Sequence, residues 1–222
     1  AGALEAKRRG WIGHIGVTSH RIDVAEACIA SGRFETMQFP FSYISSKRDL
    51  ALAERCEKAD MGCIAMKGLA GGLLGTNTRA CHAFMNEYPN VVPIWGIQSM
   101  AELDNWIALA EENPVLDDAL RAVIEADRRE LTGSFCRSCG YCMPCTVGIE
   151  IRQCARMNML LRRSPWQQYM TEEWREKMNK INDCIECGKC SVRCPYQLDT
   201  PKLLKYMLKD YNEFYEAHKD LL

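Results

Sequence analysis

The sequence lacks the features of a membrane-spanning or exported chain. Charged residues such as Lys67 and Arg79 interrupt every apolar stretch, so no run approaches the roughly 18 residues of a transmembrane helix. The first ten residues, AGALEAKRRG, contain no apolar segment of the kind found in signal peptides. We therefore expect no membrane span and a cytoplasmic location.

Net charge is also nearly absent, because 28 Lys and Arg residues face 29 Asp and Glu residues and leave a formal charge of −1. This balance argues against nucleic acid or an acidic membrane as the main partner. Hydrophobic residues at 47% and charged residues at 26% are typical of a globular protein. A length of 222 residues allows one large domain or two modest ones.

The chain begins without methionine, in a segment typical of the end of a helix that Gly10 would close. We therefore expect further sequence upstream.

Cysteine, by contrast, is abundant. Four of the 13 cysteines are scattered through the first half, and nine follow residue 135. Without secretory features a disulfide scaffold is disfavoured, and metal ligation is the favoured use of so many thiols. The change in cysteine content along the chain predicts a domain boundary near Asn113-Pro114.

The first half alternates short β-rich runs with amphipathic helices. Strands are predicted within 11–19, 35–41, 62–67 and 91–96. Capping patterns predict helices that begin after Ser46, with Asp49 three residues on, and after Ser99, with Glu102 three residues on. Four such units imply parallel strands, either in a small open sheet or in half of a (β/α)₈ barrel.

Four segments favour the barrel: HIGVTSH, TMQFPFSYI, CIAMKGLAGGLL and VPIWGIQSMAELDNW. In order and spacing they resemble the second half of the aldo-keto reductases. The resemblance covers about residues 1–112 and implies strands five to eight of a TIM barrel, so that the fold class is α/β followed by an all-α part.

The resemblance also implies NAD(P)H contacts at the strand ends. Thr18, Ser19 and Gln38 would bind the carboxamide. The diphosphate would lie beside Lys67, Gly68 and Leu69, and the adenosine end would approach Gly96, Ile97, Gln98 and Ser99. Thr18-Ser19 replaces the family's Ser-Asn, and Gly68 stands where a proline is common. Thr18 or Ser19 could instead only cap a helix, and Gln38 could be a polar core residue.

No catalytic residue is identified. The family's catalytic tyrosine, lysine, aspartate and histidine lie on strands two to four, and none is matched in this sequence. We therefore expect this chain alone not to transfer hydride, whereas its parent would act on a carbonyl-type small molecule.

The second half contains one cysteine motif twice. CRSCGYCMPC spans 136–145, and CIECGKCSVRC spans 184–194 before Pro195. The first three cysteines of the copies are 48 residues apart, and the fourth are 49 apart. Glycine follows the second cysteine in both copies, which indicates an internal repeat.

The second copy, C-x₂-C-x₂-C-x₃-C-P, is the run that bacterial-type ferredoxins use for a [4Fe–4S] cluster. Zinc is the alternative, but it favours two C-x₂-C pairs with a longer insert. Eight ligands suggest two clusters with exchanged fourth ligands. One set is Cys136, Cys139, Cys142 and Cys194, and the other is Cys184, Cys187, Cys190 and Cys145. Cys154 could substitute for a ligand, although a buried helix position is favoured.

Helices are predicted over 151–161, from 164 to about 178, and from Thr200 onward. This arrangement resembles alpha-helical ferredoxin domains. We expect a partial barrel over 1–113, a connecting helix and linker over 114–134, and a [4Fe–4S] domain over 135–222. A basic run would form a solvated face or dock an acidic electron carrier: Arg152, Arg156, Arg162 and Arg163.

Together the halves resemble aldo-keto reductases that carry a C-terminal ferredoxin-like domain. The function implied is an NAD(P)H-linked oxidoreductase with iron–sulfur electron transfer. The alternative is an iron–sulfur or zinc module that has only a structural or partner-binding role.

Overall fold

The computed structural model describes residues 2–131 and 135–221. These residues fall into two compact units. The N-terminal unit comprises 2–70 and 77–131, and the C-terminal unit comprises 71–76 and 135–221. The short segment 71–76 thus packs with the C-terminal unit although it follows the third strand of the N-terminal unit in the chain.

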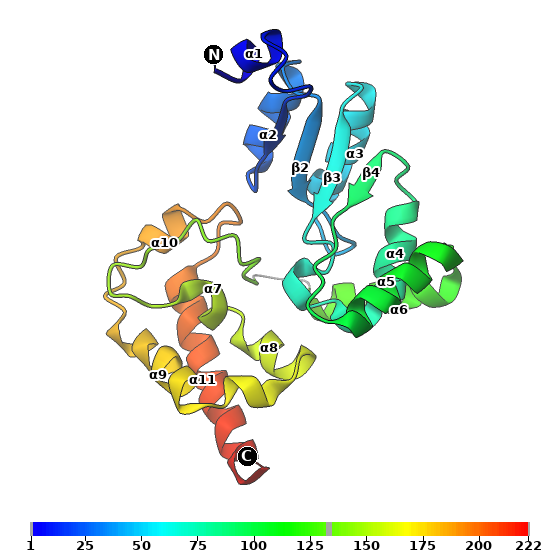
Figure 1. The fold of residues 1–222 in the computed structure, drawn as a ribbon. Helices are drawn as coiled ribbons and strands as arrows, with labels where there is room; N and C mark the ends of the chain where they lie inside the picture. The colour runs from blue at the N-terminus through cyan, green and yellow to red at the C-terminus, as the bar shows by residue number, and fades with distance from the viewer. Residues whose placement is uncertain (1, 132–134, 222) are drawn as a thin grey trace. The chain divides into compact units, whose positions relative to one another are not determined.

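The N-terminal unit is built on a parallel four-stranded sheet. Its strands are β1 (Gly16–Thr18), β2 (Thr36–Pro40), β3 (Gly62–Met66) and β4 (Val91–Pro93). They pair in the order β1-β2-β3-β4, and Figure 1 shows β2, β3 and β4 side by side. Each new strand is added on the same side of its predecessor, as in a barrel, whereas a doubly wound sheet reverses direction. The sheet is therefore compatible with half of a (β/α)₈ barrel.

Helices alternate with these strands, as the pattern predicted. They are α1 (Gly2–Arg8), α2 (Ile22–Ala30), α3 (Lys47–Lys58), α4 (Thr78–Asn86), α5 (Met100–Glu112) and α6 (Asp118–Leu131), with short 3₁₀ turns η1 (Ala70–Gly72) and η2 (Gly75–Asn77). Ser46 and Asp49 form the predicted capping box at α3. Ser99 caps α5 by accepting a hydrogen bond from the Glu102 amide. Both caps follow from local sequence alone.

The two faces of the sheet differ in burial. Met37, Phe39 and Cys63 alternate with more exposed residues and are almost fully buried. On the opposite face, Gln38 pairs in register with Ile64, and Ile64 pairs with Val92, whose side chain is 62% exposed. Side chains alternate between faces along a strand, so the sheet has one buried face and one partly exposed face, on which Gln38 and Ile64 are half-buried. A closed barrel covers both faces.

A buried polar network holds α6 in the N-terminal unit. The Tyr43 hydroxyl donates to the Asp127 carboxylate at 2.5 Å, and the Asn77 amide donates to the same oxygen at 2.8 Å. The Arg128 side chain donates to the Tyr43 carbonyl at 2.7 Å. Tyr43 and Asp127 are 0% and 5% exposed. The helix predicted within 114–131 is thus α6, and it begins at Asp118.

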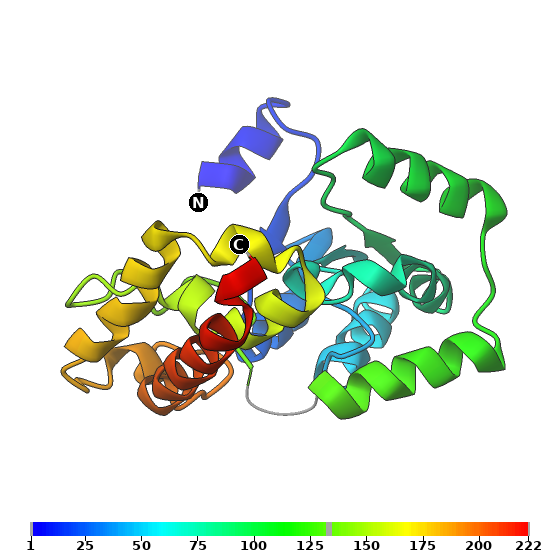
Figure 2. The same cartoon turned by 90° about the horizontal axis from the view of Figure 1, so that it is seen from below.

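The C-terminal unit is helical and has its own core. Its elements are α7 (Ile151–Cys154), α8 (Met157–Arg163), η3 (Trp166–Tyr169), α9 (Glu172–Asn179), η4 (Lys180–Asp183), α10 (Lys189–Val192), α11 (Thr200–His218) and η5 (Lys219–Leu221). The long helix α11 packs against α8 and α9, and Figure 2 shows it in red and orange. Its start at Thr200-Pro201 is as predicted, with Asp199 as the cap.

Two predicted helices are interrupted in the structure. The helix expected over 151–161 divides into α7 and α8, because Arg156, with φ −127°, departs from helical geometry. The helix expected from 164 divides into η3 and α9, because Thr171 starts a new helix by capping the Trp174 amide. Two acidic residues in the first turn of α9 are the sequence signal for this second start.

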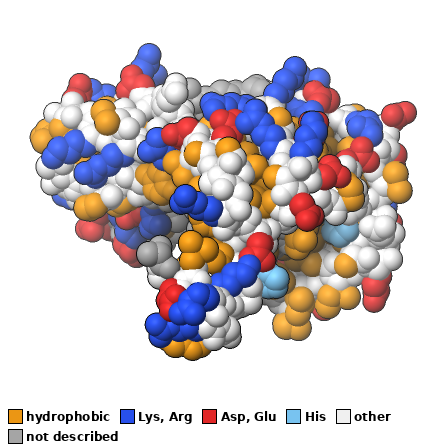
Figure 3. Space-filling view, turned by 90° about the horizontal axis from the view of Figure 1, so that it is seen from above, with side chains coloured by type: hydrophobic (Ala, Val, Ile, Leu, Met, Phe, Trp, Pro, Cys, Tyr) orange, Lys and Arg blue, Asp and Glu red, His pale blue; other side chains and the backbone are white. Residues whose placement is uncertain are grey.

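No helix in the parts of the chain that the structure describes is long and apolar enough to cross a membrane. Acidic and basic side chains are interspersed on the face shown in Figure 3, in keeping with the formal net charge of −1.

Candidate metal centre

The two cysteine motifs share left-handed backbone conformations at matched positions. Ser138 and Glu186, which occupy equivalent positions, have φ of 53° and 50°. Gly140 and Gly188 follow with 86° and 70°. Three residues after the last cysteine of each copy, φ is again positive, at Gly148 and Gln197. Left-handed residues at matched positions turn the chain in the same way, so the sequence repeat is also a structural repeat.

Hydrogen bonds repeat as well. The Gly148 amide donates to the Cys145 carbonyl and the Gln197 amide to the Cys194 carbonyl, both at 3.2 Å. Each copy then leads into a helix, α7 after the first and α11 after the second. Matched turns followed by a helix are what a duplicated ligand loop requires, because each loop must present its thiols inward from a fixed base.

The eight predicted cysteines line two neighbouring cavities. One cavity is bordered by Cys136, Cys139, Cys142 and Cys194. The other is bordered by Cys145, Cys184, Cys187 and Cys190, and Cys142 also reaches its edge. The last cysteine of each copy therefore faces the cavity that holds the first three cysteines of the other copy. The two copies are also in contact through the Thr146 hydroxyl, which lies 3.9 Å from the Cys187 sulfur.

The thiols surround the two cavities and do not converge on a single point. Among residues 2–131 and 135–221, no group of three His, Cys, Asp or Glu side chains is close enough to bind a single metal ion. A zinc ion draws four sulfurs to about 2.3 Å from one point. A cube occupies the space between its ligands and keeps their sulfurs farther apart. Cysteines around a cavity fit a cluster better than one zinc ion.

Burial controls the protonation of these thiols. It raises the pKa of Cys136 and Cys190, and it raises the pKa of Cys142 to about 12. Cys187 is exposed, and a hydrogen bond from the Lys189 amide lowers its pKa. Ligation requires thiolates, so metal loading must release protons from the buried cysteines.

The close approach of backbone to each cavity depends on Gly140 and Gly188. Both have positive φ, and a Cβ at Gly188 would meet no atom within 4 Å. At Gly188 the role is therefore conformational, whereas a Cβ at Gly140 would also lie 3.3 Å from the Arg152 side chain. Arg137 and Tyr196 line the first cavity, where the Arg137 guanidinium lies 4.4 Å from the Tyr196 ring and 4.8 Å from the Phe135 ring. The donor set, the turns and the cavities fit two iron–sulfur clusters.

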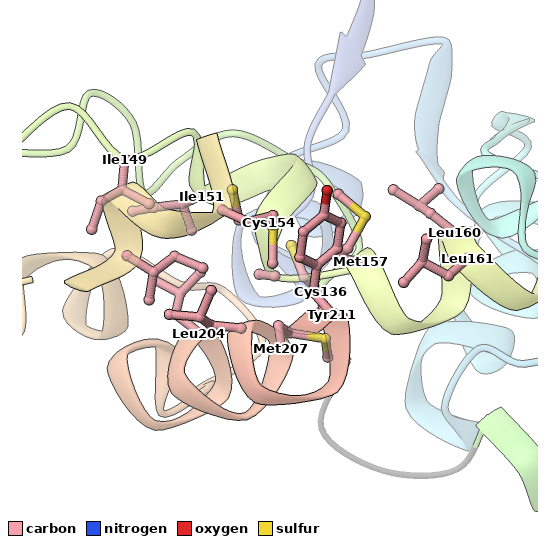
Figure 4. Packing of buried hydrophobic residues seen from close by; sticks show 14 of the residues in the cluster. Cys136, Ile149, Ile151, Cys154, Met157, Leu160, Leu161, Leu204, Met207 and Tyr211 are labelled. Atoms are coloured by element: carbon pink, nitrogen blue, oxygen red, sulfur yellow. The ribbon is translucent and has the colours of Figure 1, made fainter. Parts of the chain in front are cut away.

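Cys154 lines neither cavity. It is 0% exposed, and its thiol donates to the Lys177 carbonyl at 3.7 Å. Figure 4 shows it among core side chains of α7, α8 and α11, including Met157 and Tyr211. Its predicted position in the core is confirmed.

The predicted nucleotide contacts gather at one edge of the sheet. Thr18 ends β1, Gln38 lies on β2, and the segments 67–69 and 96–99 follow β3 and β4. The carboxyl ends of parallel strands share an edge, which is where barrels bind their ligands. The structure thus brings these four segments to the same side of the sheet.

Several of these groups are already engaged. Ser19 is buried, and its hydroxyl accepts a hydrogen bond from the Arg21 amide at 3.0 Å. The Gln38 amide contacts the Met66 sulfur at 3.7 Å. The Glu102 carboxylate accepts from the Gln98 amide at 2.6 Å. The amide-rich start of α5 thus carries an acidic side chain of its own.

The Trp95 ring leaves no space for a side chain at Gly68. A Cβ at this position would lie 2.4 Å from the Trp95 ring, which stacks on Trp106 with a centroid distance of 4.2 Å. Proline also has a Cβ, so the family's proline cannot stand here while Trp95 keeps this position. We expect Gly68→Ala to lower the free energy of unfolding by about 1–3 kcal/mol in urea denaturation.

Gly96 is the matched control for that substitution. It lies in the next predicted nucleotide segment, and a Cβ there would meet no atom within 4 Å. Gly96→Ala should leave the urea midpoint almost unchanged. Equal effects of the two substitutions would contradict the role of Trp95.

Comparison with known proteins gives two family matches. A model of the aldo/keto reductase family matches residues 2–115, and a model of a 4Fe-4S dicluster domain matches residues 135–199. Two curated relatives are "Acetyl-CoA decarbonylase/synthase complex subunit alpha 3" and "alpha 2" of Methanosarcina acetivorans, each 43% identical over 37 residues. That stretch is 17% of this chain and only 5% of either relative. No solved structure matches significantly.

Proposed function

The chain belongs to the aldo/keto reductase family and carries a 4Fe-4S dicluster domain, and from this premise we propose that it is part of an NAD(P)H-linked oxidoreductase with two [4Fe–4S] clusters. The parent protein would reduce a carbonyl-type small molecule. The observation that carries the proposal is the division of eight cysteines between two cavities, each drawing on both copies of the motif.

Each cavity supplies one complete set of four thiolates. We assign Cys136, Cys139, Cys142 and Cys194 to one cluster, and Cys145, Cys184, Cys187 and Cys190 to the other. Such clusters accept and release single electrons at potentials set by hydrogen bonds, charge and exposure. The chain's own residues fix the thiols on two matched turns and exclude water from the more buried site.

The nucleotide part of the proposal rests on the shared edge of the sheet. Thr18, Gln38 and the segments 67–69 and 96–99 would bind the nicotinamide dinucleotide there. The Glu102 carboxylate at the start of α5 would repel a phosphate at that point, which makes it a determinant of nucleotide preference. Catalytic groups for hydride transfer would come from upstream sequence, so we expect this chain alone to be inactive.

The exposure of Cys187 suggests where an electron-transfer partner would bind, and the state of the cysteines bears on the cellular compartment of the protein. An electron-carrier protein would dock near the exposed Cys187, where the second cavity is closest to solvent. None of the 13 cysteines, all of which lie in the described residues, forms a disulfide, as expected in a reducing compartment such as the cytoplasm.

The test is to purify the protein without oxygen and to measure iron, acid-labile sulfide and zinc. We expect iron and sulfide in equal amounts, a visible absorption band that dithionite bleaches, and EPR signals from two reduced clusters. Zinc without iron would overturn the proposal and favour a structural module. Nucleotide binding is tested separately by titrating the full-length parent with NADH and with NADPH and following protein fluorescence.

A further inference from the structure

One arginine of the predicted basic face is not on the surface. Arg156 is only 4% exposed, so the expectation of a solvated face is wrong at this position. Its guanidinium donates to the Gly71 carbonyl at 2.7 Å, whereas its Nε has no hydrogen-bond partner in the described part of the chain. Arginine keeps its charge even when buried. The C-terminal unit therefore contains a buried cation.

No carboxylate in the described residues forms an ion pair with this cation. Its electrostatic neighbours are the Cys136 thiol and the Tyr169 hydroxyl, while burial lowers the pKa of Arg156. A buried charge without a counterion is costly. Cys136 lines the cavity that also holds Cys139, Cys142 and Cys194. An occupied cluster there would supply the missing negative charge through its thiolates.

Among the described residues Arg156 is the only buried Lys or Arg, so the second cavity has no equivalent there. Lys189 acts on Cys187 and Lys205 acts on Cys184, and both lysines are exposed. Water and salt screen a charge in that position, whereas a buried charge acts through a low-dielectric interior. The two sites thus share a ligand pattern and differ in their electrostatic surroundings.

We propose that Arg156 is a positioning residue that raises the reduction potential of the cluster held by Cys136, Cys139, Cys142 and Cys194 above that of the other cluster. The inference rests on the proposed function, because it requires both clusters. Reduction adds one negative charge to a site that already has four thiolates, and the buried guanidinium stabilises that added charge. The cluster beside Arg156 is therefore the first to be reduced.

The test is EPR-monitored redox titration of the holoprotein with Arg156→Gln, Arg156→Lys and Arg163→Gln. Glutamine removes the charge, and lysine keeps it. Arg163 is the matched control, because its guanidinium also binds the segment 71–76, through the Leu73 carbonyl at 2.9 Å. We expect Arg156→Gln to make reduction of one cluster at least tenfold less favourable, about 59 mV for a one-electron couple. The other cluster should be unaffected.

Arg156→Lys should restore most of the potential, and Arg163→Gln should leave both midpoints in place. Unchanged midpoints in Arg156→Gln with full iron content would overturn the inference, as would equal shifts in the Gln and Lys variants. Absence of iron from the unsubstituted protein would instead refute the proposed function.

A second measurement covers the case in which Arg156→Gln does not retain iron. Cys187→Ala removes an exposed ligand of the other cavity and leaves Arg156 in place. We expect this variant to keep the signal with the higher midpoint. Retention of only the lower-midpoint signal would contradict the inference.

Discussion

Replacing Cys136 with alanine is expected to remove about half of the bound iron and one of the two EPR signals. Alanine cannot ligate, so the cavity shared with Cys139, Cys142 and Cys194 would hold only three thiolates. The other cavity keeps its own set and should retain its cluster. Iron analysis and dithionite-reduced EPR spectra of the anaerobically purified variant measure the effect.

Cys154→Ala is the matched control. Both cysteines are buried, and both substitutions remove one sulfur from the same core, but Cys154 borders neither cavity. Its variant should contain the full complement of iron. Equal losses from the two variants would mean that packing, rather than ligation, explains the effect of Cys136.

Asp127→Ala is expected to lower the free energy of unfolding of the N-terminal unit by about 2–3 kcal/mol. The substitution leaves the Tyr43 hydroxyl and the Asn77 amide without their acceptor. A buried polar group that loses its partner costs about 1–3 kcal/mol. Burial and then nearby negative charge raise the pKa of Tyr43, so this hydroxyl stays a donor at neutral pH. Urea denaturation followed by far-UV circular dichroism measures the loss.

Glu112→Ala provides the comparison, since its carboxylate pairs with Arg79 at 2.5 Å on an exposed surface. Exposed ion pairs contribute little to stability, because water and salt screen them. The visible absorbance of the clusters reports on the C-terminal unit and should follow the same urea curve in both variants. A loss for Asp127→Ala no larger than that for Glu112→Ala would contradict the importance of the buried network.

Local patterns predicted the local structure. Ser46 with Asp49 specifies the start of α3 because both hydrogen bonds of the capping box lie within four residues. The matched spacing of the cysteines likewise predicted a repeat, which the backbone angles confirm at Gly140 and Gly188. The parallel pairing of the strands followed from the alternation of strands and helices.

Features that depend on distant contacts were not predictable in the same way. Arg156, which lies at the break between α7 and α8, is buried and donates to the Gly71 carbonyl, 85 residues away in the chain. The basic run around Arg156 gave no sign of that partner. Gly68 stands where the aldo-keto reductases commonly have proline, and the Trp95 ring that excludes a Cβ there is placed beside it only by the fold.

The interleaving of the two cysteine copies has a consequence for how the C-terminal unit is assembled. Each cavity takes its fourth cysteine from the other copy of the motif. A polypeptide cleaved between residues 145 and 184 would therefore leave two fragments, neither of which contains a complete set of cysteines for a cavity. Neither fragment could be matured separately. Under the proposed ligand assignment, iron insertion at either place would require both loops to be docked.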